Sequence, residues 1–167
     1  MSELSSAPKP GAKTLILGLG NPILGDDGVG LVIVQGLRGR VKGSDVAGTT
    51  GSGLALLDLV AGYDQLYVVD ALLSRDGRVG DLVKIEDGDG AGLIHFFSSH
   101  GLDFFNIMQL GRELGYQIPK LAGVYGIKIG EKVSFDENLS EPIKERIETI
   151  RQAIIRDIVA GQPQDTT

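Results

Sequence analysis

The chain of 167 residues contains no cysteine. This absence excludes thiol catalysis, disulfide bonds and cysteine-ligated zinc from its chemistry. A chain without cysteine is typical of a reducing compartment. The function classes that remain are those that use carboxylate, imidazole, hydroxyl or backbone groups.

Long apolar runs and an excess of basic residues are also absent. No stretch approaches the ~20 consecutive apolar residues of a membrane-spanning helix. Residues 1–13 have no apolar core and do not read as a signal peptide, so we interpret them as a flexible tail of a cytoplasmic protein with no membrane partner. With 16 Lys and Arg against 22 Asp and Glu, the formal net charge is −6. A phosphate backbone needs a basic face, so nucleic acid is excluded as the main partner.

The composition and the order of apolar segments indicate a globular α/β protein. Hydrophobic residues make up 42% of the chain and charged residues 23%, as in a single soluble domain. Strands are predicted at residues 14–18, 45–48, 65–70, 79–85 and 120–129. Helices are predicted at residues 29–38, 54–60 and 103–114, and after the helix cap Ser140 through Ile158. Asp76 and Gly77 predict a hairpin that joins the third strand to the fourth.

Strands that alternate with helices predict one three-layer domain, with a mostly parallel twisted sheet and helices on both faces. We place this domain in residues 14–160 and a second flexible tail in residues 161–167.

The most informative stretch is LILGLGNPILGDDGVG, residues 15–30. It predicts a buried strand, a glycine-rich turn and a helix. A dinucleotide fingerprint needs a third glycine where this chain has Ile23, and no Gly-Lys-Ser/Thr of a phosphate loop follows. Asp26 and Asp27 would also repel a pyrophosphate. The acid pair is therefore the better candidate for activity, and a nucleotide-type α/β binding protein stays the main alternative.

The candidate chemical groups are Asp26, Asp27, Asp70 and His100. Asp27 and Asp70 follow separate strands, Asp70 as the residue that ends its strand. The carboxyl ends of parallel strands share one edge of the sheet, so both acids are expected at one crevice. His100, in a loop leading into a helix, could reach the same edge. Two carboxylates and an imidazole can hold a divalent transition metal that polarises a carbonyl or activates water.

Less specific interpretations stay open. Asp26 and Asp27 could stabilise the N-terminus of a helix and have no other role. Asp70 is harder to explain in this way, because a buried carboxylate without a partner is costly. A lone histidine such as His100 is usually solvated. A metal hydrolase that acts on small substrates also fits this set of ligands, because affinity alone does not choose the metal.

Several motifs together resemble the hydrogenase maturation endopeptidases. The stretch at residues 15–30 resembles the N-terminal signature of that family. TGSGL at residues 50–54, YVVDA at residues 67–71 and SHGL at residues 99–102 resemble its later motifs in order. The resemblance extends over residues 14–158.

The resemblance implies a function and a set of site residues. Members remove a C-terminal extension from the nickel-loaded large-subunit precursor of [NiFe]-hydrogenase. By position, Asp27, Asp70 and His100 are the implied catalytic residues and metal ligands, with nickel supplied by the precursor. Asp26, Gly20 and Asn21 have supporting roles. The protein is expected to act as a monomer, with specificity for its precursor in loops at residues 86–99 and 131–139.

Overall fold

The structure, a computed structural model, describes residues 14–51, 53–85 and 99–162, and at residues 99–103 it describes the backbone alone. The predicted tail at residues 1–13, the predicted loop at residues 86–98 and residues 163–167 of the second predicted tail lie outside this description.

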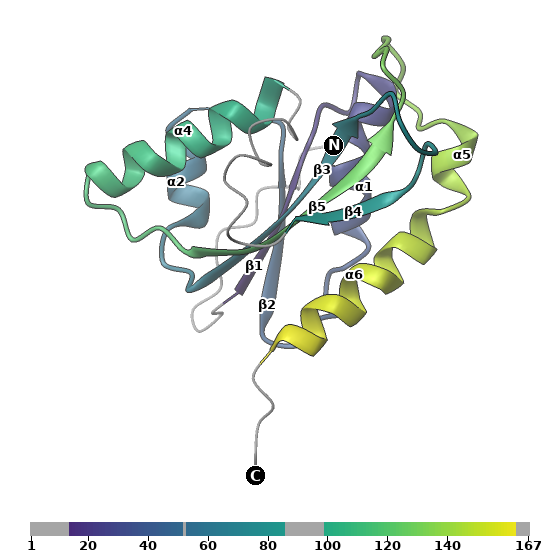
Figure 1. The fold of residues 1–167 in the computed structure, drawn as a ribbon. Coiled ribbons are helices and arrows are strands. Elements are labelled where there is room, and N and C mark those ends of the chain that lie inside the picture. Colours follow the sequence, from purple (N-terminus) through teal and green to yellow (C-terminus); the bar gives the residue numbers. More distant parts are fainter. Residues whose placement is uncertain (1–13, 52, 86–98, 163–167) are drawn as a thin grey trace.

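A five-stranded sheet in the order β2-β1-β3-β5-β4 forms the centre of the described chain (Figure 1). All neighbouring pairs are parallel except β4 and β5, which are antiparallel. The predicted, mostly parallel sheet is therefore confirmed. The strands are β1 (Thr14–Leu19), β2 (Ser44–Thr49), β3 (Gln65–Leu73), β4 (Leu82–Ile85) and β5 (Lys120–Ile129).

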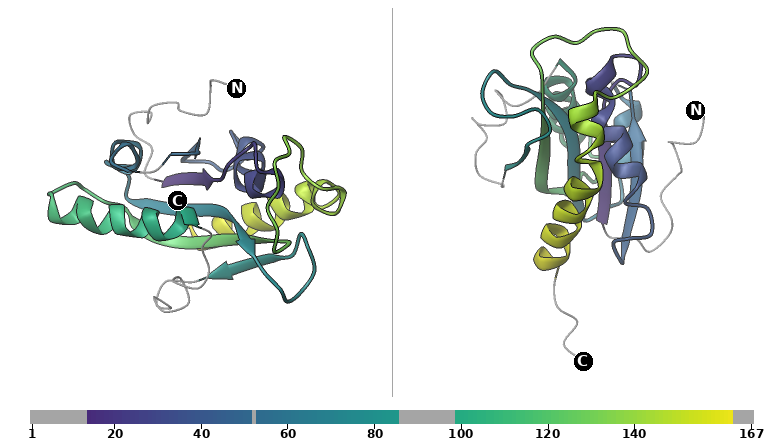
Figure 2. Two further views of the ribbon diagram at one scale, coloured as in Figure 1. Left: turned by 90° about the horizontal axis from the view of Figure 1, so that it is seen from above. Right: turned by 90° about the vertical axis from the view of Figure 1, so that its right-hand side faces the viewer.

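Helices cover both faces of the sheet, which gives the three predicted layers (Figure 2). The helices on one face are α1 (Val29–Gln35), α5 (Glu141–Lys144) and α6 (Ile147–Gly161), and those on the other are α2 (Ala55–Val60) and α4 (Ser99–Glu113). Side chains of a strand alternate between these layers: Ile16 packs in the α1 and α6 core, whereas Leu15 and Leu17 pack in the α2 and α4 core. Because both faces are buried, the strands are apolar at successive positions.

Two glycines allow α1 to lie directly against the sheet. A Cβ atom at Gly30 would come within 2.3 Å of the Leu19 carbonyl oxygen and 2.5 Å of the Val69 carbonyl oxygen. A Cβ atom at Gly18 would lie 2.5 Å from the side chain of Val34. The glycines of this motif thus serve close packing between a helix and two strands, as well as the turn at Gly20.

Strand β3 is longer than predicted. Asp70 does not end it, because Ala71, Leu72 and Leu73 continue the parallel pairing with Ile127, Lys128 and Ile129 of β5. Asp70 consequently lies within the sheet, and not in a crevice beyond its edge. A polar residue after an apolar run predicts the end of a strand, but here the apolar residues that follow Asp70 extend the pairing.

The predicted hairpin between β3 and β4 is wrong. Strand β5 pairs with β3 in parallel and with β4 in the antiparallel direction, so it lies between them. The chain turns at Gly77, which has a φ of +85°, but the returning strand is displaced by the width of one strand. Local turn residues identify the turn, whereas a strand that arrives later in the chain decides the pairing.

Helix boundaries also differ from the prediction. Helix α4 begins at Ser99 and not at Asp103, so His100 lies in its first turn and not in a loop. The predicted C-terminal helix is divided at Arg146, where φ is −106° and the side chain pairs with Asp81 at 2.8 Å. The isoleucines of both parts still face the core. In the part of the chain that the structure describes, each helix is too short or too polar to cross a membrane.

Candidate active site

Asp27 is held in the turn between β1 and α1. It belongs to the short 3-10 helix η1 (Gly25–Gly28), and its side chain is almost fully buried. Its Oδ2 atom accepts a hydrogen bond of 3.1 Å from the backbone N–H of Asn21. A Cβ atom at Gly20, where φ is +155°, would lie 2.4 Å from the carbonyl oxygen of Asp27. Gly20 and Asn21 therefore shape the turn that fixes this carboxylate.

Asp70 lies opposite Gly126 within the sheet and is fully buried. Its Oδ1 atom accepts a hydrogen bond of 2.8 Å from the backbone N–H of Ala71. Its Oδ2 atom has no hydrogen-bond partner among the described residues. Burial raises the pKa of this carboxyl to about 7; the Ala71 N–H lowers it in part, and the negative charge of Asp27 raises it further.

Asp27 and Asp70 are 43 positions apart in the sequence, and the fold brings their carboxylates close enough to interact electrostatically. Helix η1 packs on β3, and Asp27 lies close enough for its charge to raise the pKa of Asp70. A buried carboxylate with an unsatisfied oxygen beside a second carboxylate is unfavourable unless a proton or a cation shares the site. The donor set therefore fits a divalent cation, and without one Asp70 readily takes up a proton.

The backbone of His100 lies on the helix that covers the face of Asp70. Along β3, Asp70 shares its face with Leu66 and Val68, which pack in the same core as Phe104 of α4. His100 lies in the first turn of that helix. Its side chain lies outside the described residues, and the side chains that are described contain no group of three potential metal ligands.

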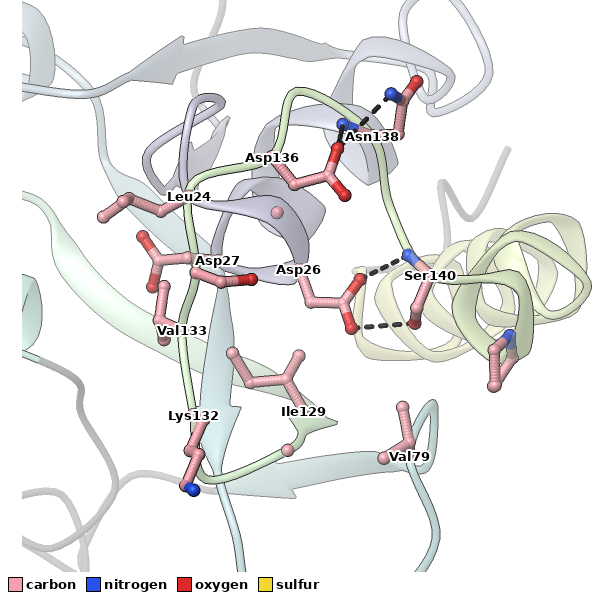
Figure 3. A pocket seen from close by; sticks show the side chains of 14 residues that line it. Leu24, Asp26, Asp27, Val79, Ile129, Lys132, Val133, Asp136, Asn138 and Ser140 are labelled. Carbon is pink, nitrogen blue, oxygen red and sulfur yellow. Dashed lines mark hydrogen bonds between the residues drawn. The ribbon is translucent and has the colours of Figure 1, made fainter.

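The neighbouring carboxylates Asp26 and Asp27 point in opposite directions (Figure 3). Asp26 Oδ1 accepts a hydrogen bond of 2.7 Å from the backbone N–H of Ser140, and its Oδ2 accepts one of 2.8 Å from the Ser140 hydroxyl. Ser140 precedes α5 as predicted, but its hydroxyl binds Asp26 and does not cap the helix. Sequence reasoning missed this partnership because nothing local connects the two residues.

A second contact joins the same two segments of the chain. The backbone N–H of Gly25 donates to the carbonyl oxygen of Asp136 at 2.7 Å, and the N–H of Asp136 donates to the carbonyl oxygen of Ile23 at 3.1 Å. The loop of residues 130–140 is therefore attached to the acid turn at two points.

An open hollow of about 350 Å³ lies between this loop and the acid turn. Asp26 and Asp27 line it, together with Val133 and Lys132 of the loop (Figure 3). Asp70 is not among its lining residues, because it is enclosed within the sheet. A substrate in the hollow would lie beside the turn that carries Asp27, whose carboxylate points away from that of Asp26. Asp70 is a buried acid that can exchange a proton near neutral pH.

A sequence profile of hydrogenase maturation proteases matches residues 44–157, which is more than half of the chain. The chain belongs to the hydrogenase maturation protease family. It is therefore an endopeptidase, a hydrolase that acts on a peptide bond. The matched region contains Asp70 and His100 and begins after the acid turn.

Individual relatives of this protease agree with that assignment. Hydrogenase 2 maturation protease of Escherichia coli K12 is 25% identical over 160 residues, which cover 92% of this chain and 97% of the relative. Hydrogenase expression/formation protein HupD of Thiocapsa roseopersicina is 29% identical over 163 residues, with 92% and 73% covered. The solved structure of the E. coli hydrogenase maturating endopeptidase HybD has the same fold, with a TM-score of 0.72, 24% identity, and coverage of 89% of this chain and 93% of HybD.

Proposed function

We propose that this maturation protease removes the C-terminal extension of a [NiFe]-hydrogenase large-subunit precursor after nickel has been inserted. The nickel is part of the substrate and is not a resident cofactor. The observation that carries the proposal is the unsatisfied Oδ2 atom of the buried Asp70 beside Asp27. Such a pair is suited to a cation that arrives with the substrate.

Asp27, Asp70 and His100 are the residues that would hold the nickel. A divalent nickel ion supplies Lewis acidity toward a carbonyl oxygen or a water molecule. Asp27 would orient the metal-loaded substrate, and Asp70 would hold the metal through its Oδ2 atom, which has no hydrogen-bond partner among the described residues. Asp26, Gly20 and Asn21 support Asp27 by fixing the turn.

In a second version of the mechanism, nickel is recognised but takes no part in the chemistry. In this version Asp70, whose pKa burial raises to about 7, acts as the general base, because a general base works best near the ambient pH. A precursor loaded with a different divalent metal separates the two versions: altered kcat indicates catalysis by the metal, and altered KM alone indicates recognition.

A processing assay tests the proposed function. Purified protein is incubated with the nickel-loaded precursor and with its metal-free form, and loss of the extension is followed by mass spectrometry. We expect cleavage of the loaded form alone, and none by Asp27→Ala, Asp70→Asn or His100→Ala. Asp58→Asn, an exposed acid on α2, is the matched control and should retain activity. Equal cleavage of both precursor forms would contradict nickel dependence.

The alternatives to this function predict different outcomes. The glycines of the nucleotide-like motif serve helix packing, so we expect no thermal shift with nucleotides. A hydrolase of small substrates would cleave short peptides with added metal and without the precursor. We further propose that the protein acts as a monomer in the cytoplasm, which sedimentation and cell fractionation can test.

A further inference from the structure

Three exposed apolar side chains lie in the two segments that border the hollow, the acid turn and the loop of residues 130–140. Phe135 is 86% exposed, Ile23 43% and Val133 39%. Phe135 is the most exposed of the large hydrophobic side chains in the described part of the chain. We call Ile23, Val133 and Phe135 the apolar rim. Clustered exposed apolar side chains are typical of interaction sites.

Backbone contacts assemble the rim from two distant segments. The hydrogen bond from the Asp136 N–H to the Ile23 carbonyl oxygen places the residue next to Phe135 against Ile23. Val133 lines the hollow together with Asp27, as do Ser134 and Asp136 on either side of Phe135. The rim is thus continuous with the wall that holds the candidate catalytic acid.

The rim is fixed before any partner arrives. The loop that carries Phe135 and Val133 is attached to the acid turn through Asp136 and again through Ser140. A surface that is already ordered loses little conformational entropy on binding, so the buried apolar area contributes more of its free energy to affinity.

We propose that the apolar rim binds an apolar side chain of the hydrogenase large-subunit precursor, close to the bond that is cleaved; this inference rests on the proposed function. The loop that carries Val133 and Phe135 is hydrogen-bonded to the turn that contains Asp27, so a precursor segment seated at Asp27 would lie beside the rim. Asp136 and Glu137 follow Phe135 directly, and the protein has a net charge of −6. The complementary segment is therefore an apolar residue with basic neighbours.

A second copy of the chain is a weaker occupant of this surface. Three side chains can bury far less surface area than the roughly 800 Å² per partner that a stable interface buries. Two copies that met at the rim would also bring Asp136 and Glu137 of each copy close to those of the other, and like charges repel.

Phe135→Ser tests the rim directly. Leu114→Ser is the matched control, since Leu114 is 59% exposed and directly follows α4. We expect Phe135→Ser to raise the KM for precursor cleavage roughly tenfold, as the loss of a buried aromatic contact predicts. The kcat at saturating precursor and the melting temperature should stay at the wild-type values, because the side chain is exposed in the free protein. Phe135→Leu should restore most of the lost affinity.

The outcomes separate this inference from the proposed function. If the wild-type protein does not cleave the loaded precursor, the proposed function fails and the rim assignment fails with it. If the wild-type protein cleaves and Phe135→Ser has an unchanged KM, the rim assignment alone is overturned. A change of sedimentation in Phe135→Ser with unchanged KM would identify the rim as a surface for self-association, which also overturns the proposal.

Discussion

Both carboxylate oxygens of Asp26 bind Ser140, one through the backbone N–H at 2.7 Å and the other through the hydroxyl at 2.8 Å. These hydrogen bonds attach the turn that carries Asp27 to the start of α5, at the far end of the chain. Asp26, the neighbour of the candidate catalytic Asp27, therefore has a structural role: it holds in place the loop of residues 130–140, which lines the hollow.

Breaking this attachment should lower stability and weaken processing together. Ser140→Ala removes the hydroxyl bond and should reduce the free energy of unfolding by about 1 kcal/mol, while Asp26→Ala removes both bonds and should cost more. Precursor cleavage should fall in the same order, because the loop of residues 130–140 loosens. Urea unfolding and the processing assay measure the two effects. Glu141→Gln changes the adjacent exposed carboxylate and should leave stability and cleavage at wild-type values. Equal effects of Ser140→Ala and Asp26→Ala would argue against the attachment.

The stability of the metal-free protein should depend on pH through Asp70. Its pKa of about 7 in the folded state is higher than the ~3.9 of an unfolded aspartate, so the folded state binds the proton more tightly. The stabilisation is complete below about pH 4 and is lost as the pH rises toward 7, with a slope approaching 1.4 kcal/mol per pH unit. Urea unfolding of wild-type protein and Asp70→Asn across this range measures the slope. Asp70→Asn should lose this part of the pH dependence and should be more stable than the wild-type protein at neutral pH. Asp58→Asn should keep the pH dependence of the wild type.

Gly30→Ala should disrupt the packing of α1 on the sheet. The added methyl group would meet two backbone carbonyl oxygens at 2.3 and 2.5 Å, which no side-chain rotation can relieve. We expect a loss of stability of about 3 kcal/mol or insoluble protein. Gly161→Ala, at the end of α6, meets only the Tyr67 hydroxyl at 3.6 Å and serves as the control in thermal unfolding. A Gly30→Ala protein with the wild-type melting temperature would mean that α1 is not packed so closely.

Arg151 joins α6 to the C-terminal end of α1. Its side chain donates to the carbonyl oxygens of Val32 at 2.6 Å and Ile33 at 3.2 Å. Arg151→Met keeps the aliphatic stem but leaves these carbonyl groups without that donor, so we expect the free energy of unfolding to fall by about 1–2 kcal/mol. Arg156→Met, at an exposed position of the same helix, should change it by less than about 0.5 kcal/mol. Chemical denaturation compares the two, and equal losses would point to helix propensity as the cause.

Most of the fold could be predicted from the order of apolar segments. Strand β5 has the predicted bounds, β1 is one residue longer than predicted, and the layers follow from strands that alternate with helices. The errors lie where partners from distant parts of the chain decide the outcome. Strand β3 continues past Asp70 because β5 pairs with it there, and β4 pairs with β5 instead of β3. A local pattern cannot contain that information.

The amino-acid sequence by itself determined the α/β class, the acid pair after the first strand, and the apolar strand that contains Asp70. Hydrophobic periodicity and turn residues act over a few positions, and so they can be read without a fold. Only the tertiary structure decided that Asp70 is enclosed beside Asp27 with an unsatisfied oxygen, and that Asp26 binds Ser140 instead of facing the site. Burial and long-range hydrogen bonds depend on which segments pack together, and the pKa of a carboxyl group follows from that packing.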